Sequence, residues 1–264
     1  MQQPLMESKI SFLYLRRFNG AMAILHFVQA VLMLVMGLVI TNIRDFKLPV
    51  DYYFQSFDTQ QMRLFVDSDV IGSSVFLFLS TLAHLLVVLP GVNNFYNSRL
   101  KMGINYFRWF EYALSSSVMI VIISMLFGAR DIGTIVAIVG LNATMNLLGL
   151  MMEIHNQTTS KTNWSSFIIG CISGAIPWVV ILLYFLGSAV KTPEVIDQIP
   201  WFVYAIFGTY FVLFNLFPVN MVLQYKKVGK WRDYLYGERG YIILSLVAKS
   251  LLAWLVFAGT LQPA

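Results

Sequence analysis

The first candidate for chemistry is a lysine inside an apolar stretch. Lys249 lies near the middle of residues 240–260 (GYIILSLVAKSLLAWLVFAGT), a stretch long enough to cross a bilayer. It is roughly 14 Å from the nearer end, and an unpaired ammonium at that depth costs several kcal/mol. The cost falls if the amine is bonded to a carbonyl ligand or matched by a buried carboxylate. The position predicts either a covalent ligand site or a structural ion pair.

Glu111 is the carboxylate that can pair with this lysine. It lies about 10 Å into the apolar stretch 104–128, and Lys249 lies about 14 Å into its own, counted from the same predicted side. No other acidic residue falls inside a predicted span away from its ends. Arg108, one turn away, could compete for Glu111, but its long side chain could also reach the surface. We therefore expect Lys249 and Glu111 to face each other.

Other polar side chains recur at a similar depth and predict a hydrated hydrogen-bond network beside the lysine. Two histidines on different helices, with the glutamate already committed to Lys249, make a weak zinc site, so no metal site is predicted. The spacing of His26 and Gln29 places both on one helix face. The members of the predicted network and its neighbours are His26, Gln29, His84, Ser115, Asn142 and Ser245.

The composition is typical of a polytopic membrane protein. Of the 264 residues, 58% are hydrophobic and 12% are charged, which leaves too little polar sequence for a second folded domain. We therefore expect a single domain over residues 1–264. A nucleic-acid partner is a poor explanation for the net charge of +5, because membrane topology already explains it. The single cysteine, Cys171, lies in an apolar stretch and is predicted to serve packing.

Seven apolar stretches predict an all-α membrane protein, a seven-transmembrane-helix bundle. Nearly everything outside them is predicted as loop, after a leader at residues 1–17. Only the loop at 41–69 is long, and the aromatic and β-branched residues of 46–57 favour a short β-hairpin. This loop is either a solvated linker or a self-association surface. The predicted spans are residues 18–40, 70–90, 104–128, 133–152, 165–186, 201–223 and 240–260.

The loop charges predict the orientation in the membrane. Most lysines and arginines outside the spans fall in the leader and in the second, fourth and sixth loops. By the positive-inside rule, the N-terminus is cytoplasmic and the C-terminus is extracellular. The first apolar stretch is too long for the core of a signal peptide, so we expect it to remain as a span. The sequence thus predicts a multi-pass protein of the cell membrane with the 41–69 loop outside.

Four runs of sequence resemble the heliorhodopsins, a branch of the microbial retinal proteins, and the resemblance extends through all seven spans. The runs are RWFEYALSSSVMI (108–120), GLNATM (140–145), CISGAIPW (171–178) and GERGYIILSLVAKSLLAW (237–254). The resemblance implies that Lys249 holds all-trans retinal as a protonated Schiff base, with Glu111 as its counterion and His26 and His84 nearby. It also implies a homodimer formed through the first loop and neighbouring helices. Its pocket positions are Ser245, Tyr112, Ser116, Met119, Asn142, Met145, Phe214 and Asn215.

The apolar residues of the chain agree with such a chromophore, because a polyene needs an apolar slot across the bundle. Each of these residues taken alone is more often plain core. Pro177 also removes one helical hydrogen bond, so we expect a kink there. The residues that could form the slot are Met119, Met145, Pro177, Trp178, Phe214 and Trp254.

A comparison with ion-pumping rhodopsins favours a light sensor. Those proteins usually carry an aspartate one turn before the lysine, where this chain has Ser245. Proton pumps add a donor carboxyl group three turns beyond the counterion, where this chain has Ile122. Toward the outside the last span offers Leu251, Trp254 and Phe257 but no carboxylate or histidine. We therefore expect no net ion pumping, a slow photocycle and no enzymatic activity.

The expected partners are membrane lipid, a second copy of the chain and an unidentified cytoplasmic protein that reads a light-induced helix shift. Two alternative functions remain open. One is a light-driven proton transporter or a light-gated channel, and the other is a seven-helix receptor that does not absorb light.

Overall fold

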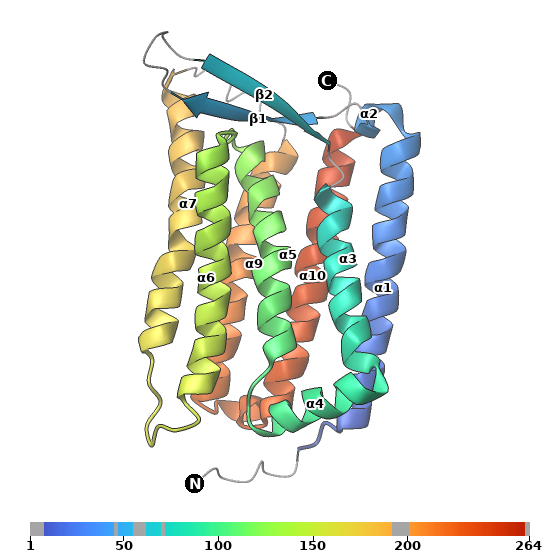
Figure 1. Cartoon of the computed structure of the whole chain (residues 1–264), viewed down its shortest axis with the longest axis vertical. Coiled ribbons are helices and arrows are strands. Elements are labelled where there is room, and N and C mark those ends of the chain that lie inside the picture. Colours follow the sequence, from blue (N-terminus) through green and yellow to red (C-terminus); the bar gives the residue numbers. More distant parts are fainter. Residues whose placement is uncertain (1–7, 45–46, 55–61, 70–71, 192–200, 262–264) are drawn as a thin grey trace.

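The computed structural model describes residues 8–44, 47–54, 62–69, 72–191 and 201–261. Long helices stand side by side, with a β-hairpin across one end and the short helix α4 (Pro90–Lys101) across the other (Figure 1). We call these the hairpin end and the α4 end. The long helices are α1 (Phe12–Val39), α3 (Gly72–Val88), α5 (Tyr106–Leu126), α6 (Ile132–His155), α7 (Ser165–Lys191), α9 (Trp201–Tyr225) and α10 (Tyr234–Thr260).

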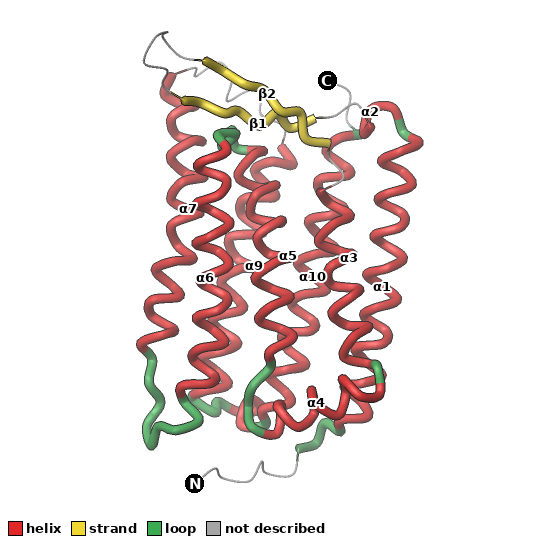
Figure 2. Tube along the Cα trace, viewed as in Figure 1, coloured by secondary structure: helices red, strands yellow, loops and turns green. Residues whose placement is uncertain are grey.

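The predicted bundle of seven membrane-spanning helices is confirmed. Six of the described helices are individually long and apolar enough to cross a bilayer. A bent pair, Ser74–Val88 with Pro90–Lys101, supplies the seventh span. The tube view shows that regular secondary structure accounts for nearly all of the described chain (Figure 2).

Polar side chains just before four of the helices fix where those helices begin. Ser11, Asn105, Asp131 and Asp233 each accept a hydrogen bond from a backbone N–H in the first turn of the helix that follows. These bonds satisfy donors that have no partner within the helix. Two starts differ from the prediction as a result: α1 already begins at Phe12, and α10 begins at Tyr234 and not at residue 240.

Helix α4 corrects the prediction of a loop after the second span. The chain turns by 89° at the break before Pro90, whose ring is tolerated in a first turn because the N–H that it lacks would have no helical partner there. Arg16 donates two hydrogen bonds to the Val88 carbonyl oxygen, at 3.0 and 2.8 Å, and so satisfies the end of α3. Tyr96 and Leu100 are buried against α1 and α10, which hold α4 in place.

The first loop forms the predicted hairpin, but over a longer stretch than residues 46–57. That stretch contains only strand β1 (Lys47–Phe54), which pairs antiparallel with β2 (Met62–Asp69) in a register from Lys47 opposite Asp69 to Phe54 opposite Met62. Eight-residue strands need this longer segment. The hairpin is joined to the bundle where the Asp51 N–H donates to the Arg130 carbonyl oxygen at 2.8 Å, between α5 and α6.

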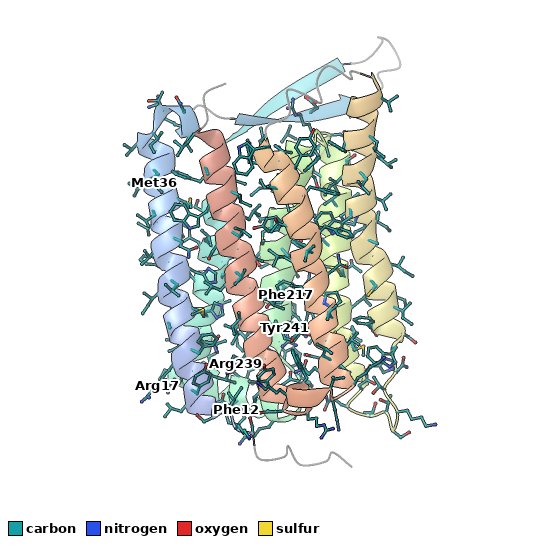
Figure 3. All side chains as sticks on the ribbon, turned by 180° about the vertical axis from the view of Figure 1, so that it is seen from behind. Phe12, Arg17, Met36, Phe217, Arg239 and Tyr241 are labelled. Atoms are coloured by element: carbon teal, nitrogen blue, oxygen red, sulfur yellow. The ribbon has the colours of Figure 1, made fainter. Side chains whose placement is uncertain are left out.

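Apolar and polar residues occupy different halves of the bundle interior. The main apolar core contains Ile120, Ile123, Ile206 and Leu252 and lies toward the hairpin end. Buried charged and amide side chains gather toward the α4 end, and Figure 3 shows Tyr241 there, on the side of Phe12 and Arg239 and away from Met36. The lysine of α10 lies where these two halves meet.

Candidate functional site

The structure brings Lys249 and Glu111 together, as the sequence predicted. The Nζ atom of Lys249 donates to Oε1 of Glu111 at 2.5 Å and to Oγ of Ser245 at 2.8 Å. Both side chains are buried, at 3% and 8% exposure. Burial makes each charge depend on the other, because removing one partner would leave the other uncompensated in an apolar surrounding. The pair links α5 to α10.

A serine that the sequence reasoning missed completes the surroundings of Glu111. Ser80 on α3 is buried and donates to the same Oε1 atom of Glu111 at 2.7 Å. It lies one helical turn before His84, a spacing that could have indicated a shared face. The ring of Tyr112 lies beside the lysine, with its centroid 5.3 Å from Nζ. Ser115, one turn beyond Glu111, is fully buried.

The two histidines lie together, in line with the predicted polar network. The rings of His26 on α1 and His84 on α3 are stacked at 5.6 Å, and Nδ1 of His84 is 2.7 Å from Oδ1 of Asn19. Neither ring nitrogen of His26 has a hydrogen-bond partner among the described residues. Gln29 lies one turn further along α1, and no hydrogen bond links it to the pair in the described part of the chain.

A cavity of about 400 Å³ begins at the lysine and runs between α5, α6, α7, α9 and α10. This size is within the range of pockets that hold small organic ligands. Trp178 forms one part of its wall, and its ring packs edge-on against Phe211 and Phe214 at 5.4 and 5.6 Å. Predicted site residues that line the cavity are Lys249, Ser245, Tyr112, Ser115, Ser116, Met119, Met145, Phe214 and Asn215.

Asn142 supports the cavity wall without being one of the lining residues. Its Nδ2 atom donates to Ser116 at 2.7 Å and to Ser117 at 3.0 Å. Asn146, one turn further along α6, was not predicted, and it both lines the cavity and donates to Ser116 at 3.1 Å. The amide of Asn142 indicated the correct helix face, and the spacing of four residues could have indicated the second amide, Asn146.

A close contact between α6 and α7 shapes the same cavity. A Cβ atom added at Gly174 would come within 2.1 Å of the sulfur of Met145, so glycine leaves room for the position that this side chain takes. Met145 can therefore lie across α7 at the cavity wall. The CISGAIPW run thus carries a glycine that the sequence reasoning did not single out.

Two predicted residues of the apolar slot, and the predicted packing role of Cys171, are corrected by the structure. Trp254 is 41% exposed and does not line the cavity, because five residues after Lys249 the helix has turned by about 140°. Pro177 is buried but is not one of the residues that line the cavity. Cys171 is exposed and lines the cavity, so it is not the packed core residue that was expected.

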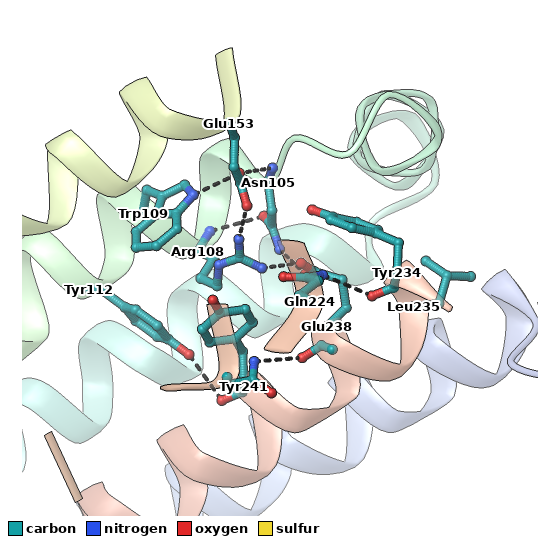
Figure 4. Close-up of polar contacts among 12 residues, drawn as sticks. Asn105, Arg108, Trp109, Tyr112, Glu153, Gln224, Tyr234, Leu235, Glu238 and Tyr241 are labelled. Atoms are coloured by element: carbon teal, nitrogen blue, oxygen red, sulfur yellow. Dashed lines mark hydrogen bonds and ion pairs between the residues drawn. The ribbon is translucent and has the colours of Figure 1, made fainter. Parts of the chain in front are cut away.

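A second buried charge cluster, not predicted from the sequence, lies toward the α4 end. Arg108 is 6% exposed and forms ion pairs with both Glu153 on α6 and Glu238 on α10, each 1% exposed (Figure 4). Asn105 donates to both carboxylates, through its N–H to Glu153 at 2.9 Å and through Nδ2 to Glu238 at 2.7 Å. Trp109 donates to Glu153 at 2.7 Å.

Arg108 therefore takes neither of the two positions left open for it, at Glu111 or at the surface, and the view of Glu111 as the single interior carboxylate is wrong. Glu153 and Glu238 were overlooked because they lie just outside the predicted limits at residues 152 and 240. The structure extends both helices and places these residues inside the bundle. The cluster ties α5, α6 and α10 together through one cation and two carboxylates.

A small polar cavity connects the two charge clusters. It has a volume of about 40 Å³, and its wall includes His84, Glu111 and Ser245 on one side and Arg108 and Glu238 on the other. A polar cavity of this size can accommodate water. The described residues contain no group of three or more His, Cys, Asp or Glu side chains that could hold a metal ion.

Fold and site together define a membrane protein in which a buried lysine, paired with a carboxylate, lies at the wall of an apolar cavity. The family model of heliorhodopsin matches residues 15–261, and the chain belongs to this family. A search of curated proteins gives no match. Family membership makes the chain a multi-pass, retinal-binding and light-sensing rhodopsin. Rhodopsins are generally not classed as enzymes.

The Arg108 cluster yields the first prediction. Arg108→Met should destabilise the protein by about 3 kcal/mol or more, because two buried carboxylates lose their cation. Thermal unfolding of the purified protein in detergent measures the effect. Arg239→Met is the matched control, since Arg239 also stacks on an aromatic ring, at 4.8 Å from Tyr236, but has no ion pair among the described residues.

Neutralising the two carboxylates as well should recover most of that loss. In Arg108→Met combined with Glu153→Gln and Glu238→Gln, no unpaired charge remains in the interior. An Arg108→Met protein as stable as the Arg239→Met control would contradict the assigned role of the cluster.

Proposed function

We propose that Lys249 carries all-trans retinal as a protonated Schiff base, that Glu111 is its counterion, and that the protein is a photosensor without net ion pumping. The observation that carries the proposal is the position of Lys249 Nζ, which is 2.5 Å from Glu111 and at the wall of the 400 Å³ cavity. In the free protein this nitrogen is an amine, and it stands in for the Schiff-base nitrogen. Retinal, when bound, supplies light absorption and a light-driven change of shape.

The cavity walls suit a long apolar ligand attached at one end. Met119 and Met145 offer flexible apolar contacts, and Trp178 and Phe214 offer flat aromatic ones. Asn146 and Ser116 add polar groups near the lysine half, already bonded to each other at 3.1 Å. These residues would hold the ligand, and the neighbouring apolar core would exclude water from it.

The distribution of polar groups supports a proton that leaves and returns on the same side. Glu111, Ser80, Ser245 and the stacked histidines form a continuous polar region that the small cavity extends toward Arg108. Toward the hairpin end, α10 continues with Leu252 and Val256, both buried in the apolar core. A hydrophobic barrier of this kind opposes proton passage.

Two further buried carboxylates lie on the same side of the lysine as Glu111. Glu153 and Glu238 could in principle exchange protons, but both are already bound to Arg108 and both lie toward the α4 end. They therefore offer no route to the opposite side. Return of the proton through a network without a dedicated donor has no reason to be fast, which favours a slow photocycle and a long-lived signalling state.

A light-driven proton transporter or light-gated channel is the second candidate. The observation that favours it is the 40 Å³ polar cavity, which joins Glu111 to the Arg108 cluster near the α4 end and so provides half of a path. The other half of such a path would have to cross the apolar core toward the hairpin end, which offers no polar route within the described part of the chain. The sensor therefore has the stronger support.

The proposal includes an orientation and an assembly. We place the N-terminus and the α4 end in the cytoplasm, where a signalling partner would read a helix shift, and we assign the hairpin to a homodimer interface. A tag at the N-terminus should then be protected from protease in intact cells, while one at the C-terminus is cleaved. Disulfide cross-linking of cysteines introduced on β1 should trap dimers.

The linkage itself is tested by Lys249→Ala. This variant should insert into the membrane but form no visible band with added retinal, because the covalent anchor is lost while the apolar span remains. Absorption spectroscopy after retinal addition measures this, and acid denaturation followed by chain mass analysis checks for attachment. A Lys249→Ala protein with retinal covalently attached would exclude Lys249 as the anchor.

The counterion is tested by Glu111→Gln. A negative charge near the nitrogen stabilises both the ground state and the protonated form, so its removal should shift the band to longer wavelength or make it titrate at lower pH. Spectra recorded over a pH series measure both effects. Glu153→Gln is a control that removes a buried carboxylate bound to Arg108 and not to Lys249. Unchanged absorption and titration in Glu111→Gln would point to another counterion.

The absence of pumping is tested electrically. Illumination should produce no steady photocurrent under voltage clamp and no sustained pH change in a cell suspension, because the proton returns to the side that it left. A steady current, or a pH change that a protonophore abolishes, would favour the transporter.

A further inference from the structure

An apolar groove runs along the membrane-facing side of the bundle between α3, α4 and α5. It has a volume of about 600 Å³ and is separate from the 400 Å³ cavity that Lys249 lines. Leu82, Phe110 and Leu114 line it and are 54%, 55% and 59% exposed, so no described part of the chain covers them. The spacing from Tyr106 to Leu114 gives it a length of about 12 Å.

A cation lies at the α4 end of this groove. The Arg99 guanidinium lies beside two of the lining aromatic rings, with its carbon 5.1 Å from the centroid of Phe95 and 5.9 Å from that of Tyr106. Its Nε atom is buried and has no hydrogen-bond partner among the described residues, and no described carboxylate pairs with it. The aromatic rings orient the guanidinium without neutralising its charge.

The opposite part of the groove reaches the functional site. Glu111, whose carboxylate binds Lys249, is itself one of the lining residues. Whatever fills the groove therefore lies against the side of Glu111 that faces the membrane. The same carboxylate separates two compartments: the amine and cavity on one side and the groove on the other.

We propose that the groove is a binding site for one anionic phospholipid, with its phosphate on Arg99 and an acyl chain along α3 and α5. The charge is complementary, because a guanidinium whose described side-chain contact is a long one, 3.7 Å from Nη1 to the Met102 sulfur, and that pairs with no described carboxylate suits a phosphate. The position is also suitable: α4 turns by 89° from the bundle direction, which puts Arg99 at the level expected for lipid headgroups. The groove below it is apolar, as an acyl chain requires.

The bound chain forms the outer wall of the Glu111 site. On the membrane side it keeps water away from the Glu111 carboxylate. When the lipid is lost, water can approach the ion pair with Lys249. This spectral consequence rests on the proposed retinal function, whereas lipid binding itself does not. The lipid thus tunes the counterion environment, and the pigment responds to the anionic lipid content of its membrane.

Native mass spectrometry of the detergent-purified protein tests the site directly. The protein is mixed with equal amounts of dioleoyl phosphatidylglycerol and dioleoyl phosphatidylcholine, and retained lipids are counted. We expect preferential retention of one phosphatidylglycerol, and a loss of about fivefold in Arg99→Gln. Arg239→Gln is the matched control, because Arg239 is also stacked on a ring, Tyr236, but lies outside the groove. Equal losses in the two variants, or equal retention of the two lipids, would overturn the proposal.

A second variant fills the groove without removing the charge. Leu114→Trp should abolish retention of phosphatidylglycerol, while Leu183→Trp, at a residue of α7 that is 64% exposed, should retain it. Oleate is added to the same lipid mixture as a competitor. Retention of oleate in place of phosphatidylglycerol would overturn the phospholipid assignment. A different result would assign the groove to a second copy of the chain. In that case the wild-type protein would retain no lipid, and Leu114→Trp would no longer form dimers.

The link to the pigment is tested in vesicles. The pH titration of the band should differ between phosphatidylglycerol and phosphatidylcholine vesicles for the wild-type protein, and this difference should vanish in Leu114→Trp. Retention of lipid without any spectral difference would overturn the tuning role alone. Failure to form a pigment would count against the proposed function. The lipid-retention experiment would still decide whether the groove binds a phospholipid.

Discussion

The pairing of Lys249 with Glu111 is the constraint on which the surrounding structure depends. Two opposite charges buried at 3% and 8% exposure are tolerable only if each stays within reach of the other. This requirement fixes how α5 and α10 approach each other, and it explains why hydroxyl groups from Ser80 and Ser245 converge on the same few atoms. Every surrounding helix must then supply either a further hydrogen bond or an apolar wall, and none may add a competing charge.

The bundle meets this requirement by separating its charges along the helix direction. Arg108, the nearest strong cation that could compete for Glu111, is instead held by Glu153 and Glu238 on the α4 side. The arginine is thereby removed from competition, and the lysine keeps its own carboxylate. On the other side, buried residues such as Ile120 and Leu252 leave no polar group to draw the pair toward the hairpin. A site with polar neighbours on one side only responds asymmetrically to any change in charge at the lysine nitrogen.

The sequence predicted the spans, the hairpin and the Lys249–Glu111 pair because each depends on strong local signals: long apolar runs, β-branched residues and the high cost of a buried charge. It did not predict α4, which is too polar for a span and is held by contacts of Tyr96 and Leu100 with distant helices. The cluster at Arg108 was missed because α6 and α10 extend past the predicted limits at residues 152 and 240, and hydropathy does not detect the cap at Asp233 that sets the start of α10. Helical phase excluded Trp254 from the cavity, because the helix turns by about 140° over the five residues after Lys249, and the prediction considered its residue type without this phase.

The right-angled turn after Val88 has a mechanical consequence for the membrane. Helix α3 has 17 residues and a length of about 26 Å, which is short of the roughly 30 Å hydrocarbon thickness of a typical bilayer, whereas α1 beside it has 28 residues. The mismatch falls on one flank of the bundle, so lipids there must compress while those elsewhere need not. The protein therefore acts as an uneven inclusion that favours thin or easily deformed bilayers. Its partitioning between vesicles of short-chain and long-chain lipids would reveal this preference, and equal partitioning would exclude it.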